Sequence, residues 1–277
     1  MSVGVKYILL STFYFSIMNV FVKKLSHLPS SEITLFRSLL PLIFSYVMIK
    51  RAKINPWGNN KKLLFLRGLF GTGGLILYFY TLHNMPLANA VTLQYLSPIF
   101  ATLIAGFVFK EKVNTIQLFF FLISFSGILV IKGFDTNISY QLLLIGIFSA
   151  LCSGIAYNII RKLKDHDEAI VTLFYFTLVT VPLVLPYVIF HWVTPNLFDW
   201  IYILIIGITT QVAQIYMTKA YQADKISKVA NLNYIGAIYA ITFGYLFFDE
   251  KLTMQSFIGI LLIIFGSILS TRYKEKI

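Results

Sequence analysis

The sequence predicts an all-α integral membrane protein in which ten transmembrane helices form two inverted five-helix repeats. Three observations support this prediction. Hydrophobic residues make up 58% of the chain and charged residues only 12%, whereas about a quarter of the residues of a soluble domain are charged. Apolar stretches long enough to cross a bilayer recur along the whole chain. A pattern of residues in the first half also returns in the second half, at an offset of 139 residues.

Dividing the sequence at its charged and turn-forming clusters leaves ten apolar stretches. A helix of about 20 residues crosses a hydrocarbon core of about 30 Å. The predicted spans are residues 3–22, 32–49, 63–83, 86–109, 114–132, 141–160, 169–190, 200–218, 226–248 and 253–271. The first stretch resembles a secretory signal peptide because Lys6 precedes an apolar run. No small-residue cleavage site follows it, so we interpret it as the first span.

Lysine and arginine are distributed unevenly between the two sides of the predicted membrane protein. Of 23 such residues, seventeen fall on the side of the N-terminus, four on the opposite side and two, Arg37 and Arg67, within spans. Positive charge accumulates on the cytoplasmic side of membrane proteins. We therefore expect both termini to be cytoplasmic and the protein to lie in the cell (inner or plasma) membrane. The net charge of +12 then needs no nucleic-acid partner.

The two halves, predicted as residues 1–136 and 137–277, share a pattern of identical residues. Eight of 39 aligned positions agree between residues 95–133 and 234–272, among them Tyr95 with Tyr234, Phe109 with Phe248, Glu111 with Glu250 and Gly127 with Gly266. At an offset of 138, Lys24-Leu25 matches Lys162-Leu163. Because each half has five spans, the second half must lie upside down in the bilayer. Inverted repeats of this kind are typical of secondary transporters that work by alternating access.

Several motifs resemble those of a known family. The first half holds Arg37, the run RGLFGTGGLILYFYTLHNMPLANAVTLQYLSPIF from Arg67, and FKEK followed by Gly127; the second holds AYQADKISKVANLNYIGAIYA and FFDEK followed by Gly266. With these motifs nearly the whole chain resembles the ten-helix EamA branch of the drug/metabolite transporter superfamily. One difference is Ala237, where the second unit often has a proline like Pro98 of the first. The resemblance implies a carrier of small organic metabolites or amino acids without a catalytic centre, with a small-molecule substrate and the lipid bilayer as its partners.

Polar side chains inside the predicted spans are the candidate substrate-binding residues. A polar group in hydrocarbon is costly unless it faces a partner or a wet cavity. The candidates are Asn19, Arg37, Gln94, Tyr95, Asn158, Gln211, Gln214, Asn231 and Tyr234. They come from corresponding spans of both halves, which favours a shared cavity. The alternative is that these groups only form hydrogen bonds between helices.

Two arginines, one proline and a group of glycines in the spans each allow two interpretations. Arg37 either anchors outward at the interface or binds an anionic group such as a carboxylate. We expect Arg67 to anchor at the cytoplasmic interface. Pro98 removes one backbone hydrogen bond and either bends its helix or exposes a carbonyl to the substrate. The glycines in GLFGTGG predict a small-residue surface for close helix packing rather than a phosphate loop.

Two other classes of protein were considered. A membrane-embedded transferase would need acidic or histidine clusters, and the nearest run, DHDE at residues 165–168, is interpreted as a solvated turn. A channel would need a ring of charge or a repeated filter segment. The single cysteine, Cys152, allows no intramolecular disulfide. We expect no enzymatic activity, no cofactor and no metal site.

A short acid-base motif closes the fourth span of each half, in FVFKEKVN and in LFFDEKLT. Glu111 and Glu250 occupy equivalent positions in it. We interpret both motifs as tight turns in which the glutamate lies near the positive end of the helix that follows. The alternative is a gate between the two halves.

Overall fold

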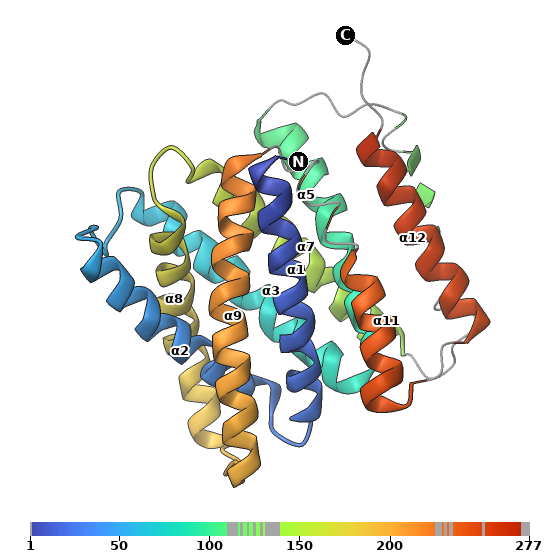
Figure 1. Cartoon of the computed structure of the whole chain (residues 1–277), viewed down its shortest axis with the longest axis horizontal. Coiled ribbons are helices and arrows are strands. Elements are labelled where there is room, and N and C mark those ends of the chain that lie inside the picture. The colour runs from blue at the N-terminus through green and yellow to red at the C-terminus, as the bar shows by residue number, and fades with distance from the viewer. Residues whose placement is uncertain are drawn as a thin grey trace.

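The protein was analysed as a computed structural model, which describes residues 2–109, 139–224, 235–250 and 253–272, with residues 116, 119–120, 122–123, 126–127, 130, 229 and 232. Within these residues the regular structure is helical. The elements are α1 (Val3–Lys24), α2 (Ser30–Arg51), α3 (Lys61–Asn84), α4 (Leu87–Gln94), α5 (Leu96–Val108), α7 (Tyr140–Lys162), α8 (Ala169–Phe190), α9 (Leu197–Ala223), α11 (Ile235–Phe248) and α12 (Met254–Arg272). Figure 1 shows them as a bundle in which α1 begins and α12 ends at the same end.

The helices follow the predicted spans closely. Among the described residues, seven stretches are long and apolar enough to cross a membrane: α1, α2, α3, α7, α8, α9 and residues 89–108. The helix ends differ from the predicted ones by no more than five residues for the first three, sixth, seventh and eighth spans. The tenth span corresponds to α12. The fifth, 114–132, lies mostly outside the described residues, as does the beginning of the ninth.

The fourth predicted span, 86–109, is two helices rather than one. α4 ends at Gln94, Tyr95 forms a turn, and α5 begins at Leu96. Pro98 explains the break, because it cannot donate a hydrogen bond to the carbonyl of Gln94 four residues earlier and its ring clashes with that carbonyl. The interruption therefore lies near the middle of the span.

Apolar and polar side chains are distributed between the surface and the interior as expected of a membrane protein. Many large apolar side chains are exposed, among them Phe107 at 87% and Phe190 at 83%. Ser11, Thr34 and Ser149 are each 0% exposed. Since hydrocarbon solvates apolar side chains but not hydroxyl groups, polar residues gather inside such a bundle.

Helices from the two halves pack against one another. α1 lies along α9, α3 along α7, and α2 along α8. Glycine permits the close approach of α3, since a Cβ atom on Gly74 would lie 2.9 Å from the Ser153 hydroxyl and one on Gly68 would lie 2.6 Å from Cβ of Val179. The small-residue surface expected from GLFGTGG is thus a contact surface. Gly73 differs, because a Cβ there would meet nothing within 4 Å.

Hydrogen bonds tie the loops at both ends of the bundle. We call the end that contains Lys23 the Lys23 end and the opposite end the Arg161 end. At the Lys23 end, His27 contacts the Asp199 carboxylate at 3.0 Å. At the Arg161 end, Asp167 accepts hydrogen bonds from the backbone N–H groups of Asn59 and Asn60.

The predicted solvated turn at residues 165–168 is therefore wrong for Asp167, which is only 7% exposed. Its carboxylate accepts hydrogen bonds at the start of α3, where backbone N–H groups have no partner within the helix. Asp167 ties the loop between α7 and α8 to this helix start, which is a structural role.

Candidate functional site

A polar cavity of about 150 Å³ lies in the middle of the bundle. Its wall is formed by α1, α2, α3, α4 and α5 of the first half and by α7, α8, α9 and α11 of the second. On α1 the lining residues run from Thr12 to Asn19, a length of about 10 Å at 1.5 Å per residue. The cavity is small for a ligand pocket, since these typically measure about 300–1,000 Å³, so as it stands it admits a small solute.

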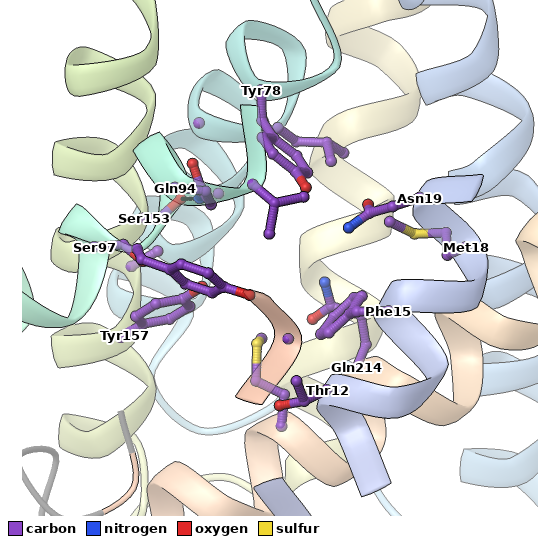
Figure 2. A pocket seen from close by; sticks show the side chains of 18 of the residues that line it. Thr12, Phe15, Met18, Asn19, Tyr78, Gln94, Ser97, Ser153, Tyr157 and Gln214 are labelled. Carbon is purple, nitrogen blue, oxygen red and sulfur yellow. Dashed lines mark hydrogen bonds between the residues drawn. The ribbon is translucent and has the colours of Figure 1, made fainter. Parts of the chain in front are cut away.

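Neutral polar side chains converge on this cavity. Figure 2 shows Asn19 and Gln214 reaching in from α1 and α9, and Tyr78 pointing toward the same space. Gln94 lies on the opposite wall beside Ser153. The amides and hydroxyls can both donate and accept hydrogen bonds, so this part of the wall can bind polar groups of either kind.

The structure separates the predicted substrate-binding residues into three groups. Those in the cavity wall are Asn19, Arg37, Gln94, Tyr95 and Gln214. Asn158 and Gln211 are absent from the wall as described. Asn231 and Tyr234 lie outside the described residues. Binding of a substrate by any of them stays a prediction, because the structure contains the protein alone.

Asn158 and Gln211 instead form contacts between helices. The Asn158 amide donates to the carbonyls of Ala101 and Gly154, both at 2.9 Å. Gln211 makes longer contacts with the Ser45 hydroxyl, at 3.3 and 3.4 Å. For these two residues the structure agrees with the alternative that polar groups in spans only hold helices together.

Gln94 is held in one orientation at the end of α4. Its amide nitrogen donates to the Ser153 hydroxyl at 2.7 Å, and its amide oxygen accepts from the Ser149 hydroxyl at 3.1 Å. Ser149 also lies 2.7 Å from the carbonyl of Gly74. These contacts fix the amide at the break between α4 and α5, so this part of the wall is preorganised.

Arg37 and Arg67 bring two positive charges into the cavity wall. Their side chains are 2% and 3% exposed, so outward anchoring of Arg37 is excluded and the expected interfacial position of Arg67 is wrong. Arg67 lies six residues into α3, about 9 Å from its start, and turns inward toward α8. Gly71, one turn further on, makes room for it, because a Cβ there would collide with the Arg67 Nη1 atom.

Aromatic rings contact both guanidinium groups, and two nitrogen atoms of each have no hydrogen-bond partner in the part of the chain that the structure describes. Cζ of Arg67 lies 4.3 Å from the Phe176 ring centroid, and Cζ of Arg37 lies 5.8 Å from the same centroid and 5.6 Å from that of Phe79. The Nε and Nη1 atoms of each arginine are buried without a hydrogen-bond partner among the described residues. An arginine at mid-span costs about 2.5–3.5 kcal/mol, and a cation–π contact offsets about 0.5–2 kcal/mol of that.

Sequence reasoning missed several residues of the wall, among them Tyr78 and Tyr157. Arg67, Gly71, Gly74 and Tyr78 follow one another at spacings of four, three and four, which places them on one face of α3. This periodicity was the available signal for Tyr78. Tyr157 stands 138 residues after Asn19, the offset of the Lys24/Lys162 match, so the repeat was the signal for it.

Contacts between the halves lie one helical turn from the cavity, toward the Lys23 end. Lys23 Nζ lies 2.8 Å from Oε1 of Glu250, and both oxygens of that carboxylate accept from the Leu87 N–H at 3.0 Å. Lys23 is one turn beyond Asn19 on α1, and Leu87 is one turn before Val91 on α4. The glutamate of the acid-base motif therefore caps α4 of the other half, whereas we had expected it to act on the helix that follows it.

A similar arrangement of cation and ring occurs at both ends of the bundle. At one end Lys23 Nζ lies 5.5 Å from the Phe248 ring centroid. At the other, Cζ of Arg161 lies 4.4 Å from the Phe109 ring centroid. Arg161 is one turn beyond Tyr157 on α7, as Lys23 is one turn beyond Asn19 on α1.

The protein is a helical bundle with an apolar surface, and its two halves share a cavity whose wall carries polar side chains. This is the architecture of a polytopic membrane transporter. Comparison with known proteins identifies the family. The model of the EamA-like transporter family matches residues 2–133 and again residues 141–272. The chain therefore belongs to the EamA-like transporter family of the drug/metabolite superfamily, and it is a multi-pass membrane transporter rather than an enzyme.

Named relatives match almost the whole chain. It is 29% identical over 275 residues to the pseudopaline exporter CntI of Pseudomonas aeruginosa, covering 98% of this chain and 97% of that protein. Solute carrier family 35 member G1 of Mus musculus is 30% identical, with 94% of this chain and 76% of that protein covered. The S-adenosylmethionine uptake transporter of Rickettsia prowazekii is 25% identical, with 99% and 93% covered.

A solved structure shows the same fold at lower sequence identity. The crystal structure of a protein that is 16% identical matches with a TM-score of 0.74, over 96% of this chain and 95% of that one. The arrangement of helices described above is therefore shared with an experimentally observed protein.

Proposed function

We propose that this protein is a secondary transporter that moves small organic solutes, such as metabolites or amino acids, across the cell membrane by alternating access. One observation carries the proposal: the cavity has walls from both halves and lies one helical turn from a closure that also joins the halves. Asn19 in the wall and Lys23 in the closure are neighbours on α1. A small relative movement of the halves would therefore open the cavity toward that end.

Two inverted five-helix repeats, residues 1–136 and 137–277, are part of the proposal. The two family matches are offset by 139 residues, the same offset as the identical residues in the sequence. The packing of α1 on α9 and of α3 on α7 supports two equivalent halves, because exchange of the halves turns the first pair into the second. With five spans in each half, the total is ten.

The two cation–ring contacts support alternation between two closed ends. Lys23 and Arg161 are 138 residues apart, and Phe248 and Phe109 are 139 apart, so they are equivalent under the repeat. In an inverted repeat, a contact that closes one end of the bundle has an equivalent contact at the other end. Alternating access requires that the two closures open in turn.

The charge bias orients the protein in the membrane. The Lys23 end carries the few lysines of the sparsely charged side, so it faces outward, and both termini are cytoplasmic. α1 begins and α12 ends at the same end of the bundle, which supports this topology. Of the relatives, one is named an exporter and another an uptake transporter, so the direction of transport is assigned to neither here.

Side-specific labelling tests alternating access without knowledge of the solute. In a Cys152→Ser background, Ser16→Cys places a thiol in the cavity wall, and a membrane-impermeant maleimide is added to sealed vesicles of either orientation. We expect labelling mainly from the cytoplasmic side. Glu250→Gln removes the charge that pairs with Lys23 and should increase labelling from outside about tenfold.

Asp249→Asn is the matched control, because Asp249 is adjacent and has a φ of 51°, a conformation that asparagine adopts well. It should leave the labelling pattern unchanged. Equal labelling from both sides in every variant would indicate a channel, and an unchanged pattern in Glu250→Gln would remove the closure at the Lys23 end from the mechanism.

A further inference from the structure

The two cavity arginines carry hydrogen-bond donors that the protein itself does not use. Nε and Nη1 of Arg37 and of Arg67 are buried and have no hydrogen-bond partner among the described residues. A buried arginine is normally paired with a carboxylate or bonded to carbonyl groups. Two such arginines in one cavity wall therefore favour binding of a molecule of opposite charge.

No carboxylate in the described part of the protein balances them. The described lining residues include two arginines and neither aspartate nor glutamate. Glu32 lies on the same helix as Arg37, five residues earlier, but it accepts a hydrogen bond from the Val193 N–H. Glu250 is held by Lys23 and Leu87. The local excess of positive charge thus belongs to the cavity.

The two guanidinium groups are close enough to act on one small molecule. Both groups contact the Phe176 ring, whose centroid lies 4.3 Å from Cζ of Arg67 and 5.8 Å from Cζ of Arg37. A cation–π contact uses the charge of the guanidinium group and no hydrogen bond, so the Nε and Nη1 donors stay available. The planar fork of donors fits the oxygens of a carboxylate or a phosphate.

We infer that the solute bound between Arg37 and Arg67 is a small organic dianion, with two carboxylates or one phosphate monoester. This inference rests on the proposed transport function and names the substrate class of the same cavity. The neutral amides of Asn19, Gln94 and Gln214 then contact the uncharged part of the solute. No acidic side chain among the described lining residues stands ready to bind an ammonium group, which disfavours cationic solutes.

Binding is measured as the thermal shift of the purified full-length protein in detergent at constant ionic strength. The probes are succinate, glycerol 3-phosphate, alanine and dimethyl succinate, which has the shape of succinate without its charge. We expect at least one of the two dianions to raise Tm, and alanine and dimethyl succinate to have no effect. The two dianions distinguish carboxylate from phosphate recognition.

Arg37→Gln and Arg67→Gln should each weaken binding of that dianion by about ten- to a hundredfold, the value of a lost charged hydrogen bond. Each should also raise Tm in the absence of solute, because a buried charge without a partner is removed. A purely structural arginine would show the opposite change in Tm. Arg51→Gln, at the exposed end of the same helix as Arg37, is the matched control and should alter neither value.

Three results would overturn the inference. They are no shift with either dianion, an equal shift with dimethyl succinate, and unchanged affinity in both arginine variants. None of these affects the labelling test with Ser16→Cys, which reports access to the cavity from each side. Failure of that test with retained binding of dianions would remove alternating access and leave an anion-binding membrane protein.

Discussion

Positively charged side chains lie in two places, at the Lys23 end and in the cavity wall, and their partners differ. At the Lys23 end, Lys23 has Glu250 at 2.8 Å, and the Leu87 N–H completes the coordination of that carboxylate. In the cavity, Arg37 and Arg67 have cation–π contacts with aromatic rings, and their Nε and Nη1 atoms have no hydrogen-bond partner among the described residues. A cation with an internal partner joins two parts of the protein, whereas one without such a partner is available to a solute.

The largest effect is expected when the positive charge of the cavity wall is removed. Replacing both Arg37 and Arg67 by glutamine should reduce uptake of the dianion into proteoliposomes at least a hundredfold, since each charged hydrogen bond contributes about 1.5–3 kcal/mol. The Arg51→Gln protein should transport at the normal rate. Retention of more than a tenth of the uptake by the double variant would show that the arginines do not bind the solute.

A smaller change in the same place tests the position of Arg67. In Gly71→Ala the new Cβ would meet the Arg67 guanidinium and lie 2.8 Å from the Phe176 ring. Overpacking costs about 1–3 kcal/mol, so we expect affinity for the dianion to fall about tenfold by the thermal-shift titration. Gly73→Ala, where nothing lies within 4 Å, should keep the affinity; equal effects of the two variants would contradict the assigned position.

The Lys23 end is tested by a double-mutant cycle of Lys23→Gln and Glu250→Gln. The two side chains are 15% and 18% exposed, which places the pair between a surface and a buried salt bridge. We expect a coupling free energy of about 1 kcal/mol in thermal unfolding, with little loss of dianion affinity. A coupling indistinguishable from zero would mean that the pair does not hold this end closed.

The smallest effect is expected at Asn158, which is not among the lining residues of the cavity. Asn158→Ala removes a hydrogen bond to Ala101 of α5 and one to Gly154 within α7, and interhelical bonds like the first contribute about 0.6 kcal/mol on average. We expect a slight decrease in thermal stability and an unchanged affinity for the dianion. A tenfold loss of affinity would instead return Asn158 to the substrate-binding residues.

Hydropathy was sufficient to predict most of the described helices, because a helix that crosses hydrocarbon must be apolar along its length. It could not predict the break at Tyr95 with certainty, since Pro182 and Pro186 lie inside the continuous helix α8. Whether a proline bends or interrupts a helix in lipid depends on the neighbouring helices that satisfy its freed carbonyl. In α4, Gln94 is held by serines of α7, and the break is accommodated there.

Side-chain direction was harder to predict than position. Gln211 and Gln214 are three residues apart, yet only Gln214 reaches the cavity, while Gln211 contacts Ser45. Arg67 was expected at the interface because positive charge is common there, but Gly71 gives its side chain an inward path. Such choices depend on which helix packs on which face, and that information is absent from the hydropathy of a single span.

The shortness of α4 has a consequence for how the two ends of the cavity communicate. Its first residue, Leu87, bonds the Glu250 carboxylate, and its last, Gln94, stands in the wall beside Ser153. Eight residues of helix, about 10 Å from the first Cα to the last, are too short to bend appreciably. We therefore expect a solute that displaces Gln94 to shift the Leu87 N–H away from the glutamate as well, which would link occupancy of the centre to release of the outer contact.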